Sequence, residues 1–282
     1  MTHKRAQLVK AQRALRSLET DPVQRRVLAL SIADSLELLG ERPAGITLLS
    51  KALEEQPDDA GLLARLRRYL IEERDYAAAA TTLAKEAIIV RERVPQLEVR
   101  LLRAKLLEEQ LDDPAGAVSE YQRARALARQ ARAPLVALRR LYKRLGDRDG
   151  LVDTLSSLAV LTGSDAQAAA LHLEAGHTAR QDKPEAAALS FELALRREPT
   201  HEGALTALAE LYEQLERHED LVRILHRQAE QAGGAEAREI LAGAARLEDE
   251  ALGQQSLAAA TWERLLTLVP EDNEAWSQLA RL

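Results

Sequence analysis

Cysteine is absent from the 282 residues, aromatic residues make up 3% with a single phenylalanine, and long apolar runs are missing. The absence of cysteine excludes disulfide bonds, thiolate metal sites and cysteine nucleophiles. The scarcity of aromatic residues argues against a β-sandwich or barrel, whose strands use aromatic and β-branched residues. No stretch approaches the roughly 18–20 apolar residues of a membrane span. The abundant alanine and leucine favour helix instead.

Charge and hydropathy exclude two further classes of protein. Hydrophobic types make up 46% and charged types 30% of the chain, which is typical of a folded protein and not of a disordered one. The 39 lysines and arginines against 45 acids give a net charge of −6, so the whole chain is not a polycation for nucleic acid.

The segment from Met1 to Leu18 has a basic amphipathic pattern, with charges interleaved among apolar residues. A secretory signal needs a continuous apolar centre, so we expect no export and a cytoplasmic location. We interpret this segment as a helix that covers the end of a helical stack. The alternative is a helix that lies on an anionic membrane.

A sequence motif that consists of a small, a large and an apolar residue, followed by a proline, recurs along the chain. It reads Gly45, Leu49, Ala52 and Pro57, then Ala187, Phe191, Ala194 and Pro199, then Ala258, Trp262, Leu265 and Pro270. Spacings of four and three residues place the first three members on one face of a helix, and the proline ends that helix. Another helix is predicted before each motif, and the apolar residues of that helix also recur. Leu135, Leu138 and Tyr142 correspond to Leu205, Leu208 and Tyr212.

These recurring motifs divide most of the chain into seven repeats of equal length. Their bounds are 26–59, 60–93, 98–131, 132–165, 168–201, 202–235 and 239–272. Residues 1–25 are predicted to be an N-terminal amphipathic capping helix. Residues 273–282 are predicted to begin an eighth repeat of a longer array, with a C-terminal capping helix as the alternative. The facing of the first helix in repeat 98–131 stays open.

This pattern resembles the tetratricopeptide repeat (TPR) family, which pairs two antiparallel helices in every repeat of about 34 residues. The resemblance covers about nine tenths of the chain. It implies an all-α fold, a right-handed α-α superhelix of about seven TPR units with flanking helices. It also implies a protein–protein interaction scaffold that holds a peptide or partner domain in a concave groove lined by the first helices.

We find no catalytic constellation, phosphate-binding loop or metal motif, so we predict no enzyme activity and no cofactor. His172 and His177 are five residues apart and therefore on different sides of a helix, which argues against joint metal binding. His226 is expected near a helix end or on an exposed face. Trp262 and Trp276 occupy packing positions in their repeats and are expected in the core.

The charges are unevenly distributed. From Arg123 to Arg148 nine cations accompany one acid, whereas residues 202–274 carry sixteen acids and six cations. If first helices line a groove, as the resemblance implies, a cationic strip there would attract an acidic protein or peptide. The candidate partner-binding residues are Arg68, Arg140, Lys143, Arg144, His172 and Arg180. The alternative is that these charges only solvate outer faces.

Other functions stay open at this point. Helical repeats can bind RNA, here through the basic region 123–148, although the acidic end would repel phosphate. The array could instead be the regulatory or sensor part of a larger protein, or could self-associate through its basic middle and acidic end. One TPR subclass grips the carboxylate of chaperone tails with asparagine, but the sole asparagine here, Asn273, lies in a predicted turn.

Overall fold

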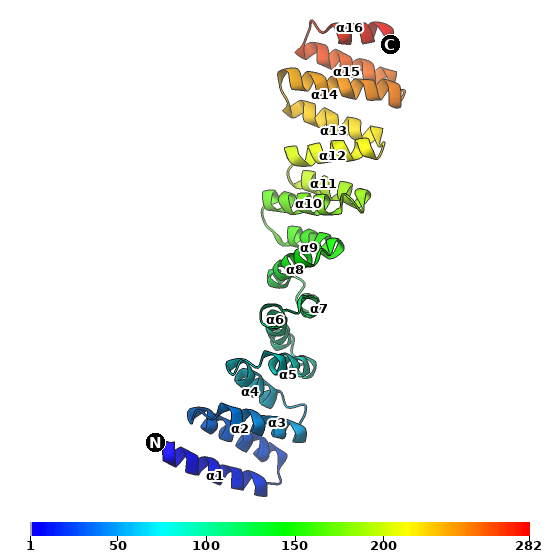
Figure 1. The fold of residues 1–282 in the computed structure, drawn as a ribbon. Helices are drawn as coiled ribbons and strands as arrows, with labels where there is room; N and C mark the ends of the chain where they lie inside the picture. The colour runs from blue at the N-terminus through cyan, green and yellow to red at the C-terminus, as the bar shows by residue number, and fades with distance from the viewer. Residues whose placement is uncertain (1) are drawn as a thin grey trace. The chain divides into compact units, whose positions relative to one another are not determined.

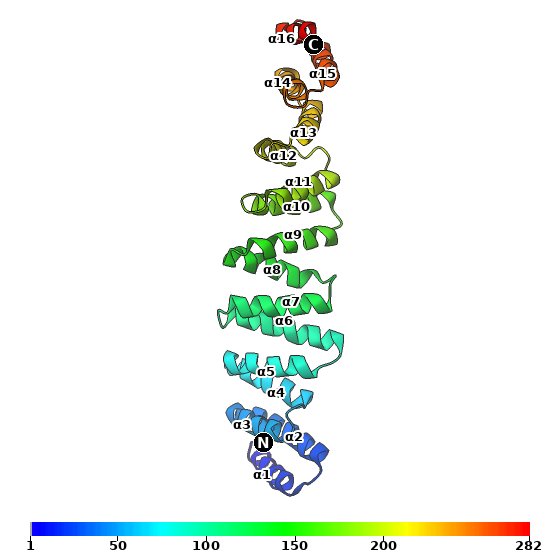
Figure 2. The same ribbon diagram turned by 90° about the vertical axis from the view of Figure 1, so that its right-hand side faces the viewer.

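The structure, a computed structural model, describes residues 2–282, and every regular element in that range is a helix. This confirms the predicted all-α class. Short turns join helices that are neighbours in the chain, and within each of the two units defined below these neighbours pack in sequence order (Figures 1 and 2). A helix inside a unit therefore buries one side against the helix before it and another against the helix after it, as a repeat stack requires.

The helices alternate with turns along the described chain. They are α1 (Thr2–Leu18), α2 (Pro22–Leu38), α3 (Arg42–Glu55), α4 (Ala60–Glu72), α5 (Tyr76–Ile89), α6 (Arg93–Glu109), α7 (Pro114–Leu127), α8 (Arg132–Leu145), α9 (Arg148–Leu161), α10 (Asp165–Ala179), α11 (Pro184–Arg197), α12 (Glu202–Gln214), α13 (His218–Gln231), α14 (Gly234–Arg246), a π-helical turn η1 (Leu247–Ala251), α15 (Gln255–Leu268) and α16 (Asn273–Arg281).

The chain separates into two compact units, Met1–Leu141 and Tyr142–Leu282, and the division falls inside α8. We call them the N-terminal and the C-terminal unit. Helices α4, α8 and α12 begin at the first residue of a predicted repeat, whereas α2, α6, α10 and α14 begin three to five residues before one. The predicted capping segment 1–25 contains α1 and the start of α2, and its Met1 lies outside the described residues.

Aspartates begin several helices. The side chain of Asp59 accepts a hydrogen bond from the backbone N–H of Leu62 (2.9 Å) at the start of α4, and Asp113 does the same for Gly116 (2.8 Å) in α7. Each carboxylate satisfies a helical N–H that has no partner inside the helix. Asp59 and Asp113 are therefore the N-caps of α4 and α7. Helices α3, α11 and α15 end two residues before the prolines that were predicted to stop them.

In the C-terminal unit, a small residue faces a large one across a helix pair. Gly176 of α10 lies so close to the ring of Phe191 in α11 that a Cβ on Gly176 would be 2.4 Å from a ring carbon. Phe191 and Tyr212 are both fully buried, in a cluster with Leu205 and Leu208. The missing side chain thus lets the two backbones approach, and the aromatic ring fills the space between them.

In the N-terminal unit, a buried ion cluster fixes the facing of α6, which the sequence left open. The Glu120 carboxylate of α7 is almost fully buried and accepts hydrogen bonds from Arg100 (3.0 Å) and Arg103 of α6, and from Arg123 (2.7 Å) of its own helix. A buried carboxylate needs such partners, because desolvation would otherwise be costly. The α6 face that carries Arg100 and Arg103 therefore points to α7.

The two tryptophans differ in a way that the sequence did not predict. Trp262 of α15 is buried, as expected, but Trp276 of α16 is 58% exposed, so the expectation that Trp276 lies in the core is wrong. In the repeat that begins at residue 202, the corresponding Leu205 belongs to α12 and is buried in a cluster that also includes residues of α13. Helix α16 packs against α15, and the indole N–H of Trp276 donates to the carbonyl oxygen of Pro270 (2.9 Å) at the surface.

The close approach at Gly176 makes a prediction with an internal control. Alanine at position 176 should lower the free energy of unfolding by about 1–3 kcal/mol, because its methyl group collides with the Phe191 ring. Alanine at position 243, in α14, has open space for the methyl group and should raise stability by about 0.5–1 kcal/mol through helix propensity. Urea unfolding followed by circular dichroism measures both, and equal effects of the two substitutions would contradict the packing account.

Candidate partner-binding site

Two adjoining hollows lie in the C-terminal unit where α8 ends and α9 and α10 pack, with volumes of about 450 and 460 Å³. We call them together the α8–α10 hollow. They share Lys143, Leu151, His177 and Thr178. The other residues that line them are Tyr142, Gly146, Asp147, Arg148, Ala170, Leu173, Glu174, Arg180 and Gln181.

The turn between α8 and α9 places cationic side chains at this hollow. Gly146 has a positive φ of 70°, a conformation that glycine adopts readily, and follows the end of α8. The Asp147 carboxylate then accepts a hydrogen bond from the backbone N–H of Gly150 (2.9 Å) and begins α9. As a result Lys143, in the last turn of α8, and Arg148, in the first turn of α9, line the same hollow, and Arg180 joins them from the end of α10.

The three cations have carboxylate partners but keep donors available. Arg148 donates to Asp182 (2.6 Å), and Arg180 donates to Glu210 (2.9 Å). The Lys143 Nζ lies 3.8 Å from Glu174, which is an ion pair but too long for a hydrogen bond, and the lysine side chain is 72% exposed. The ammonium group of Lys143 is therefore the donor most open to an incoming acceptor.

Pairing with the neighbouring repeat is a general property of the predicted cations. Each partner lies about one repeat away along the chain, and the pairs are Arg68 with Glu37, Arg140 with Glu108, Lys143 with Glu174, and Arg180 with Glu210. A carboxylate from the adjacent first helix therefore accompanies each of these four cations. Arg144, the remaining predicted cation, is exposed.

His172 needs a larger correction. It was predicted beside the cations of an open groove, but it is 6% exposed and lies inside the C-terminal unit. Its Nδ1 atom is buried without a hydrogen-bond partner. Burial lowers the pKa of His172, and the positive charge of Arg197 lowers it further, so both effects favour the neutral form of the ring. His177 is exposed on another side of α10, as the five-residue spacing predicted.

The structure brings only part of the predicted set together. Lys143 and Arg180 share the α8–α10 hollow, whereas Arg68 and Arg140 belong to the N-terminal unit. Sequence reasoning did not choose Arg148 and His177 as site residues, although both line the hollow. The positions of these two residues in their helices did not distinguish them from other polar residues of the sequence. A search for acids about one repeat away from each cation would have found the ion pairs.

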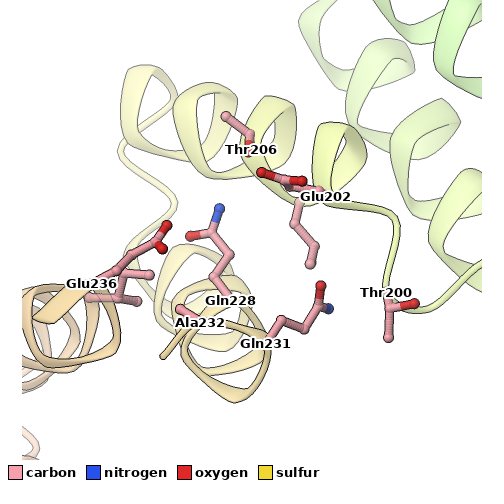
Figure 3. Close-up of a pocket in the computed structure, with 9 residues that line it drawn as sticks. Thr200, Glu202, Thr206, Gln228, Gln231, Ala232 and Glu236 are labelled. Atoms are coloured by element: carbon pink, nitrogen blue, oxygen red, sulfur yellow. The ribbon is translucent and has the colours of Figure 1, made fainter. Parts of the chain in front are cut away.

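A second hollow, of about 330 Å³, lies among α12, α13 and α14 and has the opposite character. Figure 3 shows Glu202 and Thr206 of α12 facing Gln228 of α13 and Glu236 of α14 across it. Its lining contains two carboxylates and two glutamine amides but no lysine or arginine. This hollow was missed in the sequence, because its residues come from three different helices without a shared motif.

A histidine–carboxylate pair beside the π-helical turn was also missed. The Nε2 atom of His226 lies 2.9 Å from the Glu248 carboxylate, which is buried, and Arg264 approaches the other ring nitrogen at 3.5 Å. His226 is therefore partly buried, not on an exposed face or at a helix end as expected. Between residues 2 and 282 no group of three or more His, Asp or Glu side chains is placed to hold a metal ion. None of the described helices combines the length and the apolar character needed to cross a bilayer.

The fold defines the chain as a helical-repeat protein built from antiparallel helix pairs. Among solved structures it is similar to the MamA protein (17% identity, 62% of this chain and 92% of that chain, TM-score 0.39). It is also similar to YrrB, described as a TPR protein with an unusual peptide-binding site (19%, 64% and 90%, TM-score 0.38). A third is a tetratricopeptide repeat protein from Parabacteroides merdae (12%, 89% and 96%, TM-score 0.39).

The last two proteins belong to the family that the sequence pattern resembles. No protein-family description matches the chain, and no curated protein matches it. At these identities and scores the likeness concerns the type of fold alone.

The environment of His172 predicts how stability depends on pH. The folded pKa of His172 is lowered, so at acidic pH the unfolded chain binds a proton that the folded chain does not. The contribution of His172 to the free energy of unfolding is therefore fully present above the unfolded pKa of about 6.5, and it decreases as the pH drops below that value. The free energy of unfolding, compared at pH of about 7.5 and about 5.5, should fall less in His172→Gln than in the unchanged protein. His177→Gln, at an exposed position of the same helix, should keep the original pH dependence, and parallel curves for all three proteins would contradict this account.

Proposed function

We propose that the chain is a non-catalytic protein-interaction scaffold and that its α8–α10 hollow binds an acidic segment of a partner protein. The observation that carries this proposal is the grouping of Lys143, Arg148 and Arg180 around one hollow of about 450 Å³. Each of these side chains has exposed surface, and no neighbouring carboxylate occupies all of its donors.

The lining favours a particular kind of segment. Leu151, Leu173 and Ala170 contribute apolar surface, and Lys143, Arg148 and Arg180 contribute N–H donors. A peptide with one apolar side chain flanked by aspartate or glutamate matches both features. The apolar side chain would leave water at the leucines, and the carboxylates would form charge-assisted hydrogen bonds with the cations.

Nucleic-acid binding through region 123–148 has less support. Arg123 donates to the buried Glu120, and Arg140 donates to Glu108, so these two arginines also have carboxylate partners within the chain. Residues 202–274 carry a net charge of −10, which repels phosphate. A protein segment, which tolerates a mixed-charge surface, is the better match. A regulatory or sensor role within a larger protein is the alternative that the same scaffold could serve.

The proposal is tested with peptides displayed at random on an array or on phage and selected on the whole chain. The selected peptides should be rich in Asp and Glu around one apolar residue. The double variant Lys143→Glu/Arg148→Glu should bind them about tenfold or more weakly, because two attractive contacts become repulsive. Binding by the unchanged chain should also weaken as salt is added.

Lys105→Glu is the matched control, since Lys105 is similarly exposed on α6 and lies in the other unit. This control should bind the selected peptides normally, and the melting temperatures of all three proteins should agree. Selection of neutral or basic peptides, or equal binding by the double variant, would contradict the proposed site.

A further inference from the structure

A hollow of about 270 Å³ lies between α11 and α13, the second helices of two successive repeats. Leu195 of α11 and Ile224 of α13 supply its apolar lining, and both side chains are almost fully buried. The other four lining residues are charged, and they are Glu192, Arg196, Arg223 and Arg227. We call this place the arginine hollow. Three guanidinium groups and one carboxylate give its lining a formal charge of +2.

Helical spacing brings these charges to one place. Arg196 follows Glu192 by four residues, and Arg227 follows Arg223 by four, so each pair shares a face of its helix. The grouping contrasts with its surroundings, because residues 202–274 contain sixteen acids and six cations. Two of those six cations line the arginine hollow, which is therefore a basic site within an acidic part of the chain.

The repeat pattern does not require arginine at these three positions. The corresponding positions of repeats 26–59 and 60–93 hold an acid, a hydroxyl and a single cation, namely Glu54, Thr81 and Lys85. The second helices of those repeats, α3 and α5, form nevertheless. The packing of helix pairs therefore does not account for the three arginines of the hollow.

The arginines keep N–H donors available. Among residues 2–282, the guanidinium group of Arg196 takes part in no hydrogen bond or ion pair. Arg227 donates to the carbonyl oxygen of Pro199 (2.7 Å), and one Nη atom of Arg223 lies 2.7 Å from the Asp220 carboxylate. A guanidinium group has more donors than these bonds use, so each arginine can bind a further acceptor.

Glu192, the carboxylate of the lining, leaves these donors accessible. The hydroxyl group of Tyr212 donates to it at 2.6 Å, whereas the nearest Arg223 nitrogen is 3.6 Å away, which is too long for a hydrogen bond. Its negative charge still opposes the approach of an anion. The charge of Glu192 is therefore a means to test what the hollow binds.

We propose that the arginine hollow binds a phosphate monoester, the group carried by a phosphorylated side chain or by a small phosphorylated molecule. A monoester has a charge of about −2 at neutral pH and several acceptor oxygens, which match the lining charge of +2 and the free donors. Guanidinium groups bind phosphate oxygens through two parallel N–H bonds. A carboxylate brings half of that charge. The proposal does not rest on the α8–α10 hollow, which other helices line.

An extended polyanion is a poorer match for this place. Nucleic acid and anionic membranes present many phosphates together, and the acids of residues 202–274 would repel the phosphates that do not reach the arginines. A single phosphate group brings its charge to the arginines alone. The charges around the hollow therefore favour a monoester over both kinds of surface.

Calorimetric titration of the whole chain tests the proposal with two probes, inorganic phosphate and a peptide that carries one phosphoserine among alanines and no other charged side chain. Both probes should bind, and the same peptide with unmodified serine should not. The two affinities distinguish the sources of the group. Tighter binding of the phosphopeptide indicates a protein side chain, and equal affinities indicate that the phosphate group alone is recognised, as in a small molecule.

Two substitutions should change the affinity in opposite directions. Arg196→Gln removes free donors without breaking a bond inside the chain, and it should weaken binding of both probes about tenfold or more. Glu192→Gln removes the opposing charge, while its amide oxygen can still accept from Tyr212, so it should strengthen binding several-fold. A damaged fold would not produce this gain, and a loss of affinity in Glu192→Gln would contradict the proposal.

Arg197→Gln is the matched control, since Arg197 is the next residue of α11 and pairs with Asp165 instead of lining the hollow. It should bind both probes like the unchanged chain, and so should the double variant Lys143→Glu/Arg148→Glu. The proposal fails if neither probe binds, or if either control loses as much affinity as Arg196→Gln. It also fails if duplex DNA or vesicles of anionic lipid bind more tightly than the phosphopeptide.

Discussion

The structure depends on one constraint: no helix pair of this chain can bury its apolar surface alone. Small residues such as Gly176 allow two backbones to approach, and large ones such as Phe191 fill the space that remains. Each helix pair then buries its remaining apolar surface against the next pair, so the same contact recurs along each unit. Stability is accordingly a sum of local contacts between neighbouring helix pairs.

Electrostatics follows the same period. The cations at the exposed side of the first helices meet carboxylates from the adjacent repeat, as in Arg180 with Glu210. Exposed pairs of this kind contribute little to stability individually. In the proposed site, these pairs leave a strongly basic sequence segment with a few accessible donors. Lys143, which is not held at hydrogen-bond distance, is one of these.

Much of the fold was predictable because it arises from short-range rules. Phased apolar residues indicated the helices, and Pro57, Pro199 and Pro270 indicated three helix ends, since each of these signals acts within a few residues. The site was less predictable. The burial of His172, the grouping of Arg148 with Arg180 and the exposure of Trp276 all depend on contacts between helices. A periodic sequence pattern does not contain that information.

The bridges between successive repeats have a consequence for how such a chain can change. A cation and its carboxylate lie about one repeat apart, so each module carries half of an electrostatic bond whose other half is encoded in the next module. Deleting or exchanging a single module would therefore leave unmatched charges on both of its former neighbours. The charges, like the apolar faces, therefore match only when the modules keep their order. A rearranged gene would need compensating substitutions at each new junction.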